Sequence, residues 1–290
     1  MAREINIACV QFTAVDGEKD ATIAKALRLI EAAAKQGAKL IVLPEVWTGL
    51  GYSTPTAYKE IAEPIPGPTT DKLGELAMRY GCHIVGSTYE SAPEGIMHNT
   101  ASLIGPDGKV IGLYRKTHLF DAPSRTDIKP GMRESDKVMA GDTLPVFATS
   151  IGRIGVSVCS DLRFPEIYRV MALKGAEIIV CASAFLAPRF DHWEFFLRAR
   201  ACENQVFIAA SGQVGTEPKS GIGFVGRSMI VDPWGTIIAT ASDSETFVAS
   251  TVDLDFSETV KGWYPLMDQR RPAMYGPITA AKPSTRAAAE

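Results

Sequence analysis

The sequence predicts an α/β protein built as a four-layer αββα sandwich with a pseudo-twofold internal repeat. Short apolar runs rich in Val and Ile alternate with segments of helical period along most of the 290 residues. The order of these runs in the first half recurs in the second half. Each half also contains a predicted hairpin, which argues against the alternative of a single doubly wound, all-parallel sheet.

The first half opens with a predicted strand at residues 5–11 and a helix at residues 21–36. Ile23, Leu27 and Ile30 form an apolar stripe on that helix, and Gly37 suits the position just after its end. A buried strand at 39–43, a helix at 71–80 and a strand at 84–89 follow. Strands at 101–104 and 110–114 flank Pro-Asp-Gly and form the hairpin.

The second half repeats this order from residue 154 onward. We expect strands at 154–158, 177–182 and 206–211, helices at 167–174 and 192–203, and a hairpin of 229–231 with 236–240. The helix-to-strand junctions also agree, with Gly-Ala-Lys-Leu-Ile-Val at 37–42 and Gly-Ala-Glu-Ile-Ile-Val at 175–180. Two similar halves predict two stacked sheets with the helices outside.

One domain is expected over residues 1–276, because no Pro/Gly/Ser-rich linker or charge run divides the chain earlier. From about residue 257 the period is lost, and Trp263, Tyr264 and Tyr275 lie among prolines and basic residues. Such a segment either packs on its own domain or lies across a neighbour. Residues 277–290, rich in Ala, Pro, Ser and Thr, are expected to be a disordered tail.

Composition excludes several classes of protein. The net charge of −3 provides no basic surface for nucleic acid, and no apolar run of 18 residues could span a membrane. The first residues lead directly into a strand, which argues against a signal peptide. Five widely spaced cysteines favour reduced thiols and a cytoplasmic location.

Neither a metal site nor a bound cofactor is expected. The four histidines are scattered, and no H-E-x-x-H or C-x-x-C motif occurs. Residues 221–226 match G-x-G-x-x-G, but they follow a polar loop and lead into a strand. A dinucleotide site requires a strand before the motif and a helix after it.

The most informative motif is Val-Cys-Ser-Asp-Leu-Arg-Phe-Pro-Glu at residues 158–166, which places Cys159 at the end of an apolar strand. Two other predicted strands end in charged groups, Glu45 after Leu-Pro and Lys116 after Tyr-Arg. A thiol, a carboxylate and an ammonium group at three strand ends indicate covalent catalysis on an amide-like carbon.

These motifs resemble the nitrilase superfamily of carbon–nitrogen hydrolases. The resemblance rests on Leu-Pro-Glu at 43–45, Tyr-Arg-Lys-Thr-His-Leu-Phe at 114–120 and Cys-Ser-Asp-Leu-Arg-Phe-Pro-Glu at 159–166. Further matches are His-Trp-Glu at 192–194, Arg-Ala-Arg-Ala-Cys-Glu-Asn at 198–204 and Asp-Pro-Trp-Gly at 232–235. The family's αββα sandwich agrees with the fold predicted from the repeat.

The resemblance implies a role for each group at the strand ends. Cys159 is the nucleophile and Glu45 the general base, because only a thiolate attacks well and a free thiol is mostly protonated at neutral pH. Lys116 and the backbone N–H of Ser160 hold the oxyanion. Glu134 matches a glutamate that relatives carry in a similar loop, where it orients the lysine or the substrate.

Other residues are candidates for the substrate pocket. Arg163 either binds a substrate carboxylate, as arginines in the carbamoylase branch do, or forms a salt bridge with Asp161 or Glu166. His118 lines the pocket or packs behind it. Trp47 and Tyr52 follow Glu45 and are candidates for the pocket wall.

The predicted function is hydrolysis of a small amide, bearing a carboxylate, through a thioester with release of ammonia. N-carbamoyl amino acids and nitriles remain open, because Cys-Ser-Asp departs at Ser160 from the patterns of the nitrilase, carbamoylase and omega-amidase branches. An acyltransferase would use the same thioester, and a non-catalytic scaffold is the alternative without chemistry. The resemblance also implies a homodimer or larger assembly, paired through residues 167–174 and the aromatic tail.

Overall fold

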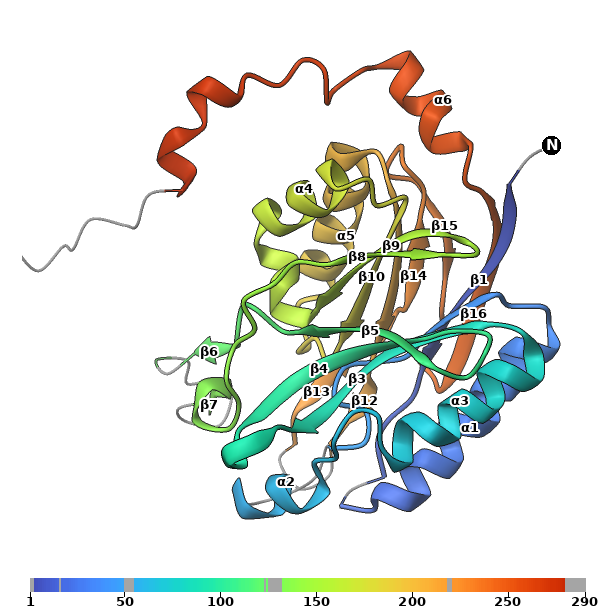
Figure 1. The fold of residues 1–290 in the computed structure, drawn as a ribbon, viewed down its shortest axis with the longest axis vertical. Helices are drawn as coiled ribbons and strands as arrows, with labels where there is room; N and C mark the ends of the chain where they lie inside the picture. The colour runs from blue at the N-terminus through green and yellow to red at the C-terminus, as the bar shows by residue number, and fades with distance from the viewer. Residues whose placement is uncertain are drawn as a thin grey trace, which may run out of the picture.

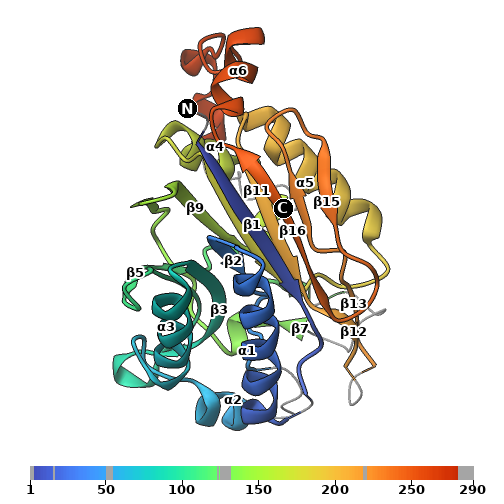
Figure 2. The same cartoon turned by 90° about the vertical axis from the view of Figure 1, so that its right-hand side faces the viewer.

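Two six-stranded sheets stack face to face, with helices on the outer face of each (Figures 1 and 2). This computed structural model describes residues 3–15, 17–49, 55–122, 124, 132–217 and 221–279. The four-layer αββα sandwich that the repeat predicts is therefore confirmed.

The first sheet has the strand order β16-β1-β2-β3-β4-β5. Its strands are β1 (Glu4–Gln11), β2 (Leu40–Val42), β3 (His83–Ser91), β4 (Met97–Ile104), β5 (Val110–Arg115) and β16 (Thr246–Asp253). Strands β1, β2 and β3 are parallel, and β4, β5 and β16 add antiparallel neighbours at the two sides. The predicted β4–β5 hairpin is confirmed.

The second sheet has the strand order β15-β14-β11-β10-β9-β8. Its strands are β8 (Val146–Thr149), β9 (Gly152–Val158), β10 (Ile178–Ser183), β11 (Phe207–Gly212), β14 (Met229–Val231) and β15 (Ile237–Thr240). Strands β9, β10 and β11 are parallel, with a hairpin on one side and antiparallel β8 on the other. The two sheets thus share one plan, in which β16 takes the place in the first sheet that β8 takes in the second.

Four helices form the outer layers: α1 (Lys19–Lys35), α3 (Pro68–Tyr80), α4 (Pro165–Leu173) and α5 (Phe190–Asn204). Ile23 and Ile30 of α1 and Leu73 of α3 pack on the first sheet. A second apolar core lies between the sheets and continues under α4 and α5, where Tyr168 and Trp193 are fully buried. Ile23 and Ile30 of the apolar stripe predicted for α1 are therefore buried, as expected of a helix that packs on a sheet.

Several described elements were not expected from the sequence. They are α2 (Pro55–Ile61), α6 (Phe256–Trp263), β8 and β16, and two short ribbons of β6 (Asp121–Ala122) with β7 (Met132–Arg133) and β12 (Val214–Thr216) with β13 (Gly223–Val225). The G-x-G-x-x-G match contains β13, which pairs with β12 and is followed by β14.

The chain leaves the sandwich after β16. Helix α6 and the segment that follows it run away from the sheets, past the end at which α4 lies (Figure 1). Residues 276–279 form a short 3₁₀ helix, and the rest of the expected tail, residues 280–290, lies outside the described residues. Within the described part of the chain, we find no helix with the length and apolar character needed to cross a membrane.

Candidate active site

Three strand ends bring the predicted groups together. Glu45 follows β2 after Leu43 and Pro44, Lys116 follows β5 directly, and Cys159 follows β9 directly. Strands β2 and β5 belong to one sheet and β9 to the other, so the site forms where the two halves of the sandwich face each other. All three side chains are buried.

A polar cluster joins two carboxylates to one ammonium group. Lys116 Nζ donates to Glu45 Oε1 and to Glu134 Oε2, each at 2.7 Å. Asn99 Nδ2 donates to Glu45 Oε1 at 2.9 Å and to Glu134 Oε1 at 2.8 Å. Backbone N–H groups complete the cluster, from Ala184 to Glu45 Oε2 at 2.9 Å and from Phe120 to Glu134 Oε2 at 2.7 Å. The carboxylates are thereby fixed as hydrogen-bond acceptors.

Cys159 occupies a sharp turn between β9 and a short 3₁₀ helix (Cys159–Arg163). Its φ of +46° lies in the left-handed region, which is strained for a residue with a Cβ. Burial raises the pKa of its thiol well above the usual value, and the charge of Glu45 raises it further, while Lys116 and Ser183 oppose the rise. The thiol is therefore protonated at neutral pH, and a nearby base is needed to activate it.

Lys116 keeps its charge although it is only 1% exposed. Burial by itself would lower the pKa of this ammonium group, but the carboxylates of Glu45 and Glu134 outweigh burial and leave the pKa well above its usual value. A positive charge therefore stays beside Cys159 over the whole range of physiological pH.

Asp161 ties the Cys159 turn to the end of β5. It accepts hydrogen bonds at Oδ2 from the Val158 N–H at 2.9 Å and the Tyr114 hydroxyl at 2.7 Å. Its Oδ1 accepts from the N–H of His118 at 3.1 Å and from His118 Nδ1 at 2.9 Å. Because the carboxylate is fully buried, these bonds fix the Lys116 segment relative to the nucleophile turn.

The structure places the remaining predicted residues as follows. The Ser160 hydroxyl donates to the His118 carbonyl, and the His118 ring stacks on Phe164 with a centroid distance of 3.8 Å. Arg163 lies over the Phe185 ring at 4.8 Å, and its Nη1 is 3.3 Å from His192 Nδ1.

Trp47 lies in the core behind Glu45. It is fully buried and meets Phe12 edge-on, with a centroid distance of 6.2 Å. Its ring belongs to the apolar cluster between the first sheet and the helices α1 and α3, and its place in the pocket wall stays a prediction. Tyr52 lies outside the described residues.

Sequence reasoning missed three contributors to this site, Asn99, Asp161 and the Ala184 N–H. Asp161 belongs to the same motif as Cys159 and follows it by two residues, so its position in the sequence could have indicated a role in the site. Asn99 and Ala184 have no comparable signal, because only the pairing of strands brings them to Glu45.

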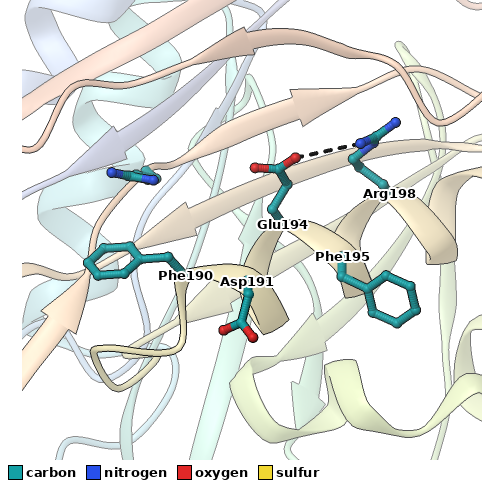
Figure 3. Close-up of a pocket in the computed structure, with 6 residues that line it drawn as sticks. Phe190, Asp191, Glu194, Phe195 and Arg198 are labelled. Carbon is teal, nitrogen blue, oxygen red and sulfur yellow. Dashed lines mark ion pairs between the residues drawn. The ribbon is translucent and has the colours of Figure 1, made fainter.

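A shallow pocket on the outer face of α5 is a separate feature. Figure 3 shows Phe190, Asp191, Glu194, Phe195 and Arg198 around it, and Glu194 and Arg198 form an ion pair at 3.5 Å. It shares no residue with the polar cluster. No grouping of three or more His, Cys, Asp or Glu side chains suited to a metal ion occurs among the residues described.

Fold and site together define a hydrolase-like αββα sandwich with a buried Glu, Lys and Cys. The sequence profile of the carbon–nitrogen hydrolase family matches residues 6–261. The chain is 34% identical to omega-amidase NIT2 of Xenopus tropicalis over 273 residues, covering 94% of this chain and 97% of that protein. It is also 34% identical to omega-amidase NIT2 of Homo sapiens over 261 residues, covering 89% and 92%.

Solved structures show the same fold. The C. elegans NitFhit protein superimposes with a TM-score of 0.85 at 31% identity, covering 94% of this chain and 66% of that chain. Saccharomyces cerevisiae Nit3, a member of branch 10 of the nitrilase superfamily, gives 0.82 at 30% identity, covering 92% and 97%. The chain therefore belongs to the carbon–nitrogen hydrolase family, and it is an enzyme that hydrolyses carbon–nitrogen bonds.

Proposed function

We propose that this protein hydrolyses a small, carboxylate-bearing amide through a thioester on Cys159 and releases ammonia. The observation that carries the proposal is the buried cluster in which Lys116 Nζ binds Glu45 Oε1 at 2.7 Å beside the Cys159 thiol. A protonated thiol, a carboxylate and a fixed cation are the groups that nucleophilic attack on an amide requires.

Glu45 first takes the thiol proton as the Cys159 sulfur attacks the amide carbon. The resulting oxyanion is held by the Lys116 ammonium and the Ser160 N–H. Collapse of this intermediate breaks the C–N bond, and Glu45 protonates the departing ammonia and leaves a thioester. Glu45 then takes a proton from water, the hydroxyl attacks the thioester, and the acid leaves as the Cys159 thiol is restored. Glu134 holds Lys116 in place throughout, through their 2.7 Å contact.

The substrate class rests on two observations. The relatives at 34% identity that cover nearly the whole chain are omega-amidases. Arg163 follows the nucleophile by four residues and lies over Phe185, whose neighbour Ala184 donates to Glu45. We infer that Arg163 binds the substrate carboxylate and that His118, stacked on Phe164, lies at the edge of the same pocket.

An ammonia-release screen tests the choice of substrate. Glutaramate-like amides, N-carbamoyl amino acids and simple nitriles are compared at equal concentration, with the Cys159→Ala variant as the blank. We expect turnover of the carboxylate-bearing amides, and Arg163→Ala raises their KM more than it raises the KM of amides without a carboxylate. Turnover confined to carbamoyl compounds or nitriles would reject the amide assignment. If added hydroxylamine receives the acyl group as a hydroxamate, and water alone yields no free acid, acyl transfer would be favoured over hydrolysis.

We also propose a homodimer or larger assembly in the cytoplasm. The exposed Trp263, Tyr264 and Met274 lie on the segment that leaves the sandwich, and Leu173 and Phe195 are exposed on α4 and α5. Aromatic surface of this kind is typical of an interface. All five cysteines are free thiols, which suits a reducing compartment. Light scattering at micromolar concentration should give at least twice the 31.2 kDa chain mass, and a monomer mass would reject the assembly.

A further inference from the structure

Asn99 lies in β4 between the two carboxylates of the site and is 1% exposed. Its amide donates one hydrogen bond to each of Glu45 and Glu134, and so spans the same pair of side chains that Lys116 spans. Its backbone carbonyl also accepts the Lys116 N–H at 2.9 Å. Asn99 is thus bonded to three of the groups on which the proposed mechanism depends.

We propose that Asn99 is a positioning residue that holds Glu45 Oε1, so that Oε2 is the oxygen that exchanges the proton with Cys159. Glu45 Oε1 accepts from both Lys116 and Asn99, whereas Oε2 accepts the Ala184 N–H. A carboxylate oxygen with two donors already bound is the poorer proton acceptor of the two. This inference rests on the proposed hydrolysis and assigns one of its proton transfers to one atom.

Asn99 also stabilises the two carboxylates of the cluster without adding a charge, because its neutral amide donates a hydrogen bond to each of them. The titratable groups around Glu45 are Lys116, Glu134, Cys159 and Tyr89. Burial raises the pKa of both Cys159 and Tyr89 well above their usual values, so neither carries charge at neutral pH. Two carboxylates therefore share one ammonium group, and the neutral amide of Asn99 supplies a further side-chain donor to each. Removing a donor to a carboxylate favours its protonated form, which cannot act as a base.

The test compares Asn99→Ala and Asn99→Asp with a matched variant of the next residue in β4, Thr100→Val. Thr100 is also buried, and its hydroxyl donates to Glu90 Oε2 at 2.6 Å, outside the Glu45 cluster. Each of the three substitutions therefore removes a buried side-chain donor to a carboxylate, and the substituted residues are neighbours in β4. The measurements are kcat/KM for the best amide over a range of pH, and the Tm of each variant.

For Asn99→Ala we expect kcat/KM at pH 7 to fall about 10- to 100-fold, and the acid limb of the profile to move up by about one to two pH units, as loss of a charged hydrogen bond implies. Asn99→Asp keeps the side-chain shape but adds a third carboxyl group, so its acid limb should move at least as far. Thr100→Val should lower Tm and leave the acid limb where the parent has it.

An unmoved acid limb in both Asn99 variants, with activity falling only in step with Tm as in Thr100→Val, would overturn the inference. If Asn99→Ala does not fold, the isosteric Asn99→Asp decides the question on the same readout. A parent enzyme that releases no ammonia from any amide would instead reject the proposed function, and so the two failures are distinguishable.

Discussion

At the scale of single residues, the site depends on a fully buried carboxylate, Asp161, that fixes the backbone around the nucleophile. Asp161 receives hydrogen bonds from Val158, next to the nucleophile, and from Tyr114 and His118, on either side of Lys116. A carboxylate can accept all of these bonds, and no neutral side chain of the same size can. The spacing of sequence motifs predicts Cys159 and Lys116, but it says nothing of the buried acid that holds their segments together.

Asp161→Asn should therefore destabilise the fold and reduce activity together. Its amide nitrogen would face a donor, leaving a buried hydrogen bond unmade, and we expect a loss of about 2–4 kcal/mol in the free energy of unfolding. Urea denaturation measures this loss. Tyr114→Phe removes one of the bonds to the same carboxylate and should cost only about 1 kcal/mol. Equal effects of the two variants would contradict the account of Asp161.

At the scale of elements, the strands that precede Glu45, Lys116 and Cys159 were predictable because β2, β5 and β9 are short and rich in Val, Ile and Leu. The Pro-Asp-Gly turn before β5 also marks where that strand begins. Strand β16 was not predicted, since it is a partly exposed strand whose pairing with β1 joins segments that lie far apart in the sequence. Helix α6 has only 8 residues and leads into the segment that leaves the sandwich, so the expectation that the period is lost from residue 257 was wrong for this helix. Tertiary pairing rather than local pattern determines such elements.

The position of Glu45 depends on close packing of β2 against β3. A Cβ on Gly86 of β3 would lie 2.6 Å from the Cβ of Leu43, two residues before Glu45. Gly86→Ala should therefore displace the Glu45 segment, cost about 1–3 kcal/mol of stability and lower kcat.

Gly262→Ala in α6 is the matched control, because a Cβ there meets no atom within 4 Å. It should stabilise the protein by about 0.5–1 kcal/mol, since alanine favours helix more than glycine does. Thermal unfolding measures the Tm of both variants and of the parent, and an assay with the best amide measures their kcat. A Gly86→Ala variant as stable and as active as the parent would contradict the packing described for β2 and β3.

At the scale of the whole molecule, the repeat in the sequence corresponds to two sheets of the same plan, and the two apolar cores of the sandwich bury thiols in neutral form. Burial raises the pKa of Cys82 to about 11 and that of Cys181 to about 12. An unfolded thiol ionises near pH 8.5, so between these values the unfolded state releases protons that the folded state keeps. The contribution of these thiols to the free energy of unfolding is therefore fully present below about pH 8.5, and it declines as pH rises toward the folded-state pKa values.

The free energy of unfolding should fall by about 1.4 kcal/mol per pH unit for each such thiol above pH 9. Urea denaturation at pH 8, 9, 10 and 11 measures the slope. Cys181→Ala removes one titrating group, so its slope should be smaller than that of the parent by about this amount even if its overall stability is lower. Parallel slopes for the two proteins would show that Cys181 is not held neutral by the core.

The central claim, that Cys159 forms an acyl link with the substrate, is tested most directly by intact-mass spectrometry of enzyme quenched in acid during turnover of the best amide. We predict a mass increase equal to the acyl group, located by peptide mapping to Cys159 and absent from Cys159→Ala. Cys202 is the exposed thiol, so Cys202→Ala serves as the control for adventitious labelling and should keep the adduct. Full turnover by Cys159→Ala, or an acyl group found only on another residue, would contradict the account.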